Sequence, residues 1–146
     1  MIVDFGLTSR EYAESDKVLS VVMSVLANIR NTHPESRIGY VAGKVTADGP
    51  DNISANLARL HSFTKQVHET KEDVFVFSAA DIFVTDAYWR ANLSESNHTQ
   101  AFYQLWKQVV ASGVTDVYMT PDWEKSLGAC DEHAHAKELG LIIHYL

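Results

Sequence analysis

The sequence from Thr120 to Tyr145 reads TPDWEKSLGACDEHAHAKELGLIIHY and predicts a turn, a helix and a strand in succession. Pro121 marks the turn, and Gly140 ends the helix before an apolar strand. Residues 116–119 (DVYM) read as another strand just before the turn. A strand, loop, helix and strand in this order join parallel strands, with the loop at their carboxyl edge. We therefore expect the chemistry of this protein at that edge.

The rest of the chain continues the alternation of apolar strands and amphipathic helices. We predict strands at residues 38–42, 74–79, 116–120 and 141–146, and helices at 16–30, from 51 or 52 onward, at 100–110 and after Ser126. This order indicates one α/β domain over residues 1–146, with a helical extension at 1–35 and a core at 36–146. The expected architecture is three-layer α/β/α, with a mainly parallel, flavodoxin/Rossmann-like sheet of about four to five strands.

Composition restricts the classes of function. The 146 residues carry a formal net charge of -7 without a local Lys/Arg cluster, which argues against a nucleic-acid polymer as partner. The single cysteine, Cys130, excludes an internal disulfide framework and fits a reducing compartment. No apolar run has the length of a membrane span, and the first residues lack the layout of a signal peptide. We expect a cytoplasmic protein without a membrane partner.

Two motifs resemble one known family. The segment SLGACDEHAHA, Ser126 to Ala136, is similar to the active-site helix of the nucleoside 2-deoxyribosyltransferase superfamily, which includes the 2'-deoxynucleoside 5'-phosphate N-hydrolases. The longer run from Trp123 to Leu141 resembles a less characterised bacterial and phage branch of that superfamily. Tyr40-Val-Ala-Gly43 is similar to its first strand and glycine turn. The resemblance extends from about Arg37 to the C-terminus, with a poorly matched middle.

This resemblance implies that Glu132 is a nucleophile that attacks the anomeric carbon of a 2-deoxyribosyl group and expels the nucleobase. A carboxylate suits that reaction because its negative charge stabilises an oxocarbenium-like transition state. Tyr40 matches a tyrosine that would hydrogen-bond the nucleophile or the sugar. Each has a plainer interpretation: Glu132 as a helix surface residue, and Tyr40 as a core residue with its hydroxyl at the rim.

The substrate-binding candidates are Gly43, Lys44, Trp123, Ser126 and Gly128. Gly43 lets the backbone turn and approach a ligand. By resemblance, Ser126 and Gly128 hold a 5'-phosphate at a helix amino end, although Ser126 could simply cap that helix. Lys44, or alternatively Lys125, could add charge to the phosphate. Trp123 and Trp89 could stack a base or pack in the interior.

The resemblance is interrupted at residues 104–108. The family carries an aspartate before its third strand, whereas Gln104 and Gln108 stand in that region here. Two functions from different classes follow: N-glycosidic bond cleavage or transfer on a 2'-deoxynucleoside or its 5'-monophosphate, or a non-catalytic nucleotide-binding or assembly domain. Asp81 or Asp86 could replace the missing acid.

No cofactor or metal site is expected. His133 and His135 are two positions apart on the predicted helix, so they point to different sides and cannot face one ion. The apolar stripe of the helix at 16–30 needs a partner surface, which is either the sheet of its own subunit, the interpretation we favour, or a dimer interface. We also expect a homo-oligomer.

Overall fold

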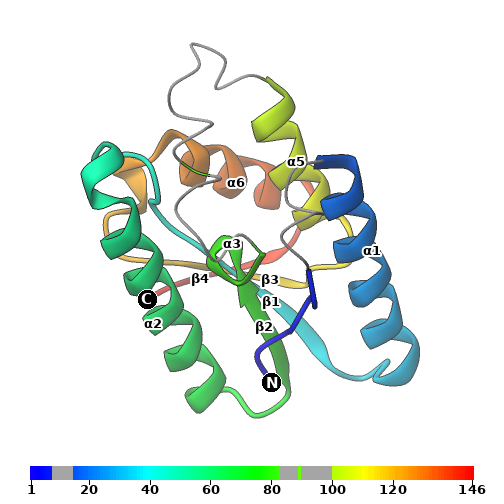
Figure 1. The fold of residues 1–146 in the computed structure, drawn as a ribbon. Helices are drawn as coiled ribbons and strands as arrows, with labels where there is room; N and C mark the ends of the chain where they lie inside the picture. Colours follow the sequence, from blue (N-terminus) through cyan, green and yellow to red (C-terminus); the bar gives the residue numbers. More distant parts are fainter. Residues whose placement is uncertain (8–14, 83–88, 90–99) are drawn as a thin grey trace.

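The structure, a computed structural model, describes residues 1–7, 15–82, 89 and 100–146 (Figure 1). Its strands are β1 (Arg37–Ala42), β2 (Val74–Ser78), β3 (Asp116–Met119) and β4 (Ile142–Tyr145). Its α-helices are α1 (Ser15–Thr32), α2 (Ile53–Thr70), α3 (Ala79–Ile82), α5 (Gln100–Ala111) and α6 (Leu127–Glu138), and its short 3-10 helices are η2 (Pro50–Asn52) and η3 (Trp123–Lys125).

The four strands form one sheet in the order β2-β1-β3-β4, and all three pairings are parallel. Central strand β1 is buried from its second residue to its last, as expected for a parallel strand covered on both faces. The prediction of a mainly parallel sheet is therefore confirmed. The four strand ends that carry Ala42, Ser78, Met119 and Tyr145 lie along one carboxyl edge.

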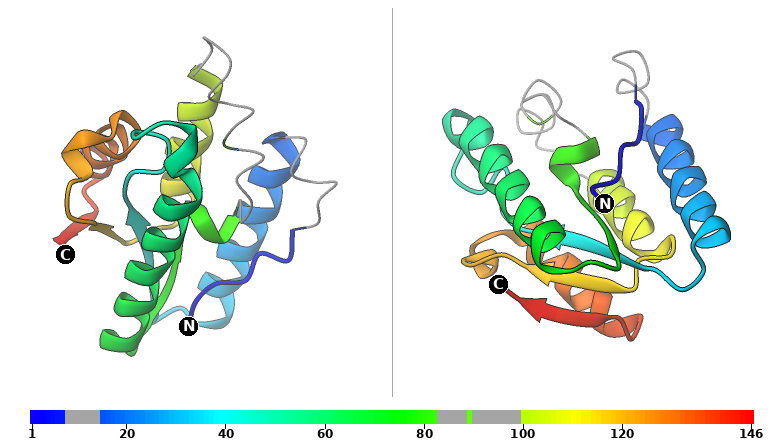
Figure 2. Two further views of the ribbon diagram at one scale, coloured as in Figure 1. Left: turned by 60° about the vertical axis from the view of Figure 1, so that its left-hand side comes forward. Right: turned by 90° about the horizontal axis from the view of Figure 1, so that it is seen from below.

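Helices cover both faces of the sheet, which confirms the three-layer α/β fold. In the views of Figures 1 and 2, α2 lies on one side of the strands, and α1 and α5 lie on the other. Helix α6 packs against α5 and against strands β1, β3 and β4. Loops that follow different strands of the sheet therefore lie near one another at its carboxyl edge.

Helix α1 packs against its own subunit. Its apolar stripe, Val18, Val22, Leu26 and Ile29, is buried in the core cluster together with strand residues Ile38 and Tyr40. The favoured interpretation of this stripe is confirmed. The first residues of the chain also join the sheet, since the Val3 amide donates to the Val76 carbonyl at 2.9 Å and the Val76 amide donates to the Met1 carbonyl at 2.9 Å.

No helix formed by the described residues is long and apolar enough to cross a membrane.

Candidate functional site

A cavity of about 380 Å³ opens at the carboxyl edge of the sheet. Residues from β1 and its following loop, from α2, α3, α5 and α6, from the end of η3 and from position 89 line it. They are Tyr40, Gly43, Val45, Thr46, Ala47, Leu60, Ala79, Trp89, Trp106, Lys125, Ser126, Leu127, Gly128, Ala129 and Glu132. Five of the sequence candidates, Tyr40, Gly43, Ser126, Gly128 and Glu132, thus meet in one cavity.

Among the described residues of this lining, Glu132 is the acidic one. It lies in the second turn of α6, is only 8% exposed, and its side chain hydrogen-bonds with that of Tyr40. Its Oε2 atom has no hydrogen-bond partner among the described residues. A buried carboxyl oxygen without a partner is costly to keep, and such groups occur where a ligand or a reaction uses them.

Burial dominates the electrostatics of Glu132. Desolvation raises the pKa of Glu132 from 4.5 to about 8, because the ionised carboxylate loses its water in the cavity. The hydrogen bond with Tyr40 acts in the opposite direction, and the charge of Asp131 adds a small increase. A carboxyl group with this pKa exchanges its proton near neutral pH, which is the range that suits acid–base and nucleophilic chemistry.

Tyr40 is held firmly in the core. Its ring is 1% exposed and meets the ring of Phe77 edge to face, with 5.2 Å between centroids. Burial, followed by the nearby charge of Glu132, raises the pKa of Tyr40 well above its ordinary value, so its hydroxyl keeps its proton. Tyr40 is therefore a fixed donor to the carboxyl group of Glu132.

The amino end of α6 forms a second wall. Ser126 is the N-cap residue, and its Oγ atom accepts a hydrogen bond from the Ala129 amide at 3.2 Å. The first intrahelical bond runs from the Cys130 amide to the Ser126 carbonyl, so the amides of Leu127 and Gly128 precede it. The first turn contains no acidic residue, so nothing there offsets the positive end of the helix dipole. This wall favours an anion.

Gly43 is required where β1 leaves the sheet. A Cβ atom at this position would collide with Oγ1 of Thr120 and approach Cδ1 of Leu60 to 3.3 Å. The Thr120 hydroxyl is itself buried without a hydrogen-bond partner in the described part of the chain. The close approach of the residue after β1 to Thr120, the residue after β3, therefore depends on glycine.

Two of the sequence candidates lie outside the cavity lining. The Lys44 ammonium pairs with the Asp48 carboxylate at 2.8 Å, within the loop that follows β1. The Trp123 ring stacks on His133 on another face of α6, with 4.2 Å between ring centroids. Lys125, the alternative cation, does line the cavity, although its Nζ atom also lies 3.4 Å from Asp122.

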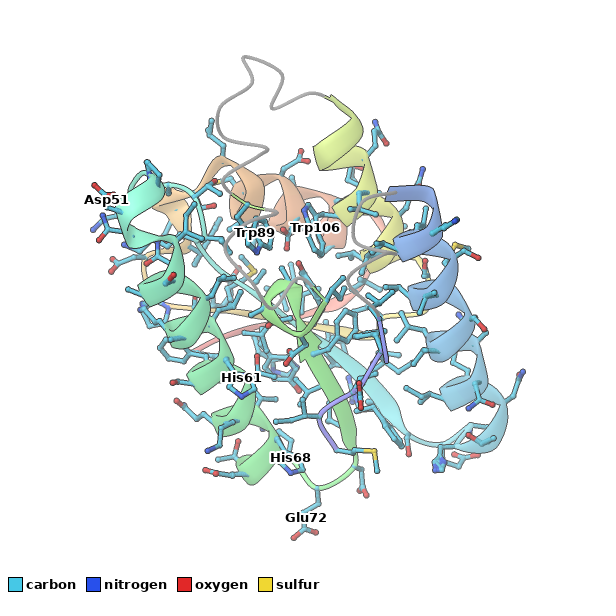
Figure 3. All side chains as sticks on the ribbon, viewed as in Figure 1. Asp51, His61, His68, Glu72, Trp89 and Trp106 are labelled. Carbon is cyan, nitrogen blue, oxygen red and sulfur yellow. The ribbon has the colours of Figure 1, made fainter. Side chains whose placement is uncertain are left out.

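Two tryptophans line the cavity. Trp89 is a base-stacking candidate of the sequence analysis, whereas Trp106 is not among the sequence candidates. Their rings are stacked, with 5.7 Å between centroids and 7° between planes, and Figure 3 shows the two side by side. The pattern of apolar residues on α5 could not reveal that one of them faces a cavity rather than the sheet.

Two further acids, half-buried Asp81 and buried Asp116, have local partners. Asp81 accepts hydrogen bonds from the Ser78 amide at 2.7 Å and hydroxyl at 3.0 Å, and its other oxygen lies 3.3 Å from His61. It does not line the cavity. Asp116 is paired at 2.7 Å with both Arg37 and His144. Asp86 lies outside the described residues.

The described residues contain no group of three or more His, Cys, Asp or Glu side chains that could hold a metal ion. His133 hydrogen-bonds instead with the Tyr145 hydroxyl at 2.7 Å, and His135 lies 3.5 Å from Glu138. Cys130, a free thiol, is half-buried near the carbonyl oxygens of Trp123 and Glu124.

The fold and the site define an α/β protein with a parallel sheet and a buried carboxyl group in a cavity at its carboxyl edge. Residues 38–145 match the family described as a domain of unknown function, DUF4406. Because the match covers most of the chain, the protein belongs to this family. Comparisons with curated proteins and with solved structures found no match.

Proposed function

We propose that this protein cleaves or transfers the N-glycosidic bond of a 2'-deoxynucleoside or its 5'-monophosphate, with Glu132 as the nucleophile. The observation that carries the proposal is the carboxyl group of Glu132, which is buried in a cavity, hydrogen-bonded to Tyr40, and left with one oxygen unpartnered among the described residues. The resemblance of Ser126 to Ala136 to the nucleoside 2-deoxyribosyltransferase superfamily gives this chemistry its substrate class.

The reaction begins with the ionised Glu132. A carboxylate oxygen bonds to C1' of the deoxyribose, the C1'–N bond breaks, and its electron pair leaves with the base, which takes a proton from water. In hydrolysis, a water molecule then attacks C1', the ester bond to Glu132 breaks, and the sugar is released while the water proton passes to solvent. In transfer, a second base replaces water. Both steps pass through an oxocarbenium-like state that the carboxylate stabilises.

The surrounding groups support this sequence of steps. Tyr40 fixes the orientation of Glu132, so that the unpartnered Oε2 atom is the oxygen available for attack. The Leu127 and Gly128 amides, the helix dipole and Lys125 favour a phosphate at the amino end of α6. Binding energy at the phosphate then holds C1' near the nucleophile.

A non-catalytic nucleotide-binding domain is the second candidate, and one observation favours it. Gln104 and Gln108, which stand where the resemblance expects an aspartate, are exposed on α5. Glu132 is the sole carboxyl group among the described residues that line the cavity. A protein that kept the anion site without the second acid would bind a nucleotide and leave it intact.

A panel of substrates separates the two functions. Deoxynucleosides and deoxynucleoside 5'-monophosphates should release free base, measured by chromatography, and the monophosphates should react at lower concentrations because of the anion site. Ribonucleotides should react more slowly, since a 2'-hydroxyl destabilises the developing cation. Binding of the monophosphates without any release of base would instead support the binding domain.

A further inference from the structure

The first residues of the chain form an arm along β2, a strand at the edge of the sheet. We call residues 1–7 the N-terminal arm, and they lie outside residues 38–145, the part that matches the family. Ile2 of the arm forms a parallel bridge with Val76 of β2. Figure 1 shows the arm, in dark blue, beside that strand. The backbone of the arm is therefore fixed relative to β2.

The one aromatic side chain of the arm enters the core. Phe5 is 5% exposed, and its ring meets the ring of Phe77 edge to face, with 5.1 Å between centroids and 75° between planes. A tight turn brackets Phe5, because the Gly6 amide donates to the Asp4 carboxylate at 2.9 Å and Gly6 has a φ of 60°. Pairing and turn together hold the Phe5 ring on Phe77.

The aromatic contacts continue to the candidate site. Phe77 is fully buried, and its ring also meets that of Tyr40 edge to face, at 5.2 Å between centroids. Tyr40 in turn hydrogen-bonds Glu132. Edge-to-face pairs favour a defined orientation of the two rings, and a closely packed core has few voids into which a ring can move. The position of Tyr40 therefore depends on the support of Phe77.

We propose that Phe5 is a positioning residue of the site, because its ring holds Phe77, and thereby Tyr40, in place. Without this support, the hydroxyl of Tyr40 leaves its best position for the hydrogen bond with Glu132. The inference rests on the proposed function for the role of Glu132, and it adds to the site a residue from outside the family match.

A substitution of Phe5 changes the geometry of the site and not its charge. The hydrogen bond with Tyr40 lowers the pKa of Glu132, so weakening that bond should raise this pKa. The other titratable groups that act on the pair or line the cavity keep their charges, and among the described residues they are Asp81, Lys125 and Asp131. The pKa of Glu132 therefore reports the position of the Tyr40 hydroxyl.

Carbon-13 NMR titration of the glutamate carboxyl groups measures this pKa without a substrate. The resonance that is missing from Glu132→Gln identifies Glu132. Phe5→Leu, which keeps apolar bulk and loses the ring, should raise the pKa of Glu132 by roughly 0.3 to 0.5, a part of the rise of roughly 1 expected for Tyr40→Phe. In a Tyr40→Phe background, Phe5→Leu should give no further rise, because the hydrogen bond through which it acts is already absent.

Val3→Ala is the matched control. Val3 lies on the same arm, is also 5% exposed, and has no ring to pack on Phe77. Its truncation should lower the temperature of thermal unfolding and leave the pKa of Glu132 at the wild-type value. A purely structural role of Phe5 predicts this same result for Phe5→Leu, which is a loss of stability without a change in the pKa of Glu132.

The outcomes separate this inference from the proposed function. A pKa of Glu132 in Phe5→Leu at or below the wild-type value, or an equal rise in the Tyr40→Phe background, would overturn the positioning role. If Phe5→Leu does not fold, Phe5→Met takes its place, since its flexible side chain fills the same space without a ring. Absence of base release by the wild type would refute the proposed function and leave the effect of Phe5 on the Tyr40–Glu132 pair intact.

Discussion

Replacing Glu132 by glutamine is expected to stabilise the protein, and the gain should grow as the pH rises from about 5 to about 8. The reason is the buried carboxyl group, whose pKa burial raises from 4.5 to about 8. One pKa unit corresponds to about 1.4 kcal/mol, so the free energy of unfolding changes by up to about 5 kcal/mol over this interval.

The direction follows from proton binding. Below pH 4.5, Glu132 is protonated in both the folded and the unfolded chain and gives no pH dependence. Between pH 4.5 and about 8, the unfolded chain releases the proton that the folded chain keeps, so the free energy of unfolding falls as the pH rises. Above pH 8, both states are ionised and the difference becomes constant. Glutamine has no titratable proton, so the free energy of unfolding of Glu132→Gln does not fall in this way as the pH rises.

Urea unfolding of the wild type and Glu132→Gln at each pH from 5 to 9 measures the effect. Glu138→Gln is the matched control, because Glu138 lies on the same helix and is exposed. The control should follow the wild type. A difference between Glu132→Gln and the wild type that stays constant from pH 5 to pH 9 would contradict the raised pKa of Glu132.

The second large effect concerns the rate of base release. If Glu132 acts as the proposed nucleophile, only its ionised form reacts, so kcat/KM should rise by about tenfold per pH unit and level off near pH 8, the pKa of Glu132 in the free protein. The increase from pH 6 to pH 8 should be about 50-fold. A deoxynucleoside without phosphate is the preferred substrate here, because a phosphate monoester itself titrates near pH 6.

Tyr40→Phe gives this pH profile a control. The hydrogen bond with Tyr40 lowers the pKa of Glu132, so its removal should move the rise in kcat/KM to a higher pH. A profile that is flat from pH 6 to pH 9 in the wild type would show that ionisation of Glu132 does not limit the reaction. An unchanged midpoint in Tyr40→Phe would show that Tyr40 does not act on the nucleophile.

The order of elements was predictable because the period of apolar residues changes along the chain. Short apolar runs such as residues 38–42 and 74–79 predict buried strands, and the observed β1 and β2 end within one residue of the predicted positions. A helix between two such strands carries the chain back to the edge of the sheet where the first strand began, so the two strands run parallel. The pairing of residues 1–3 with the edge of β2 was not predictable, since it depends on a contact across more than 70 residues.

The candidate site was predictable where backbone geometry fixes the side chain. Ser126 caps α6, and Glu132 lies on the buried side of that helix, so both face the cavity. Lys44 and Trp123 have long side chains that can reach several neighbours, and each contacts a residue outside the cavity lining. Lys44 pairs with Asp48, and the Trp123 ring stacks on His133. Trp106, in contrast, lines the cavity without having been predicted to do so. An apolar residue at helical spacing gives the same sequence pattern whether it packs on a sheet or lines a cavity.

Chromatographic measurement of free base from 2'-deoxynucleoside 5'-monophosphates, with the wild type, Glu132→Gln and Glu138→Gln side by side, tests the role of Glu132 most directly. The wild type and Glu138→Gln should release base at similar rates, and Glu132→Gln should be slower by about a thousandfold or more, since the amide lacks the charge and the nucleophilic oxygen. Equal release by all three proteins, or release by none of them, would contradict the proposal that Glu132 attacks the sugar.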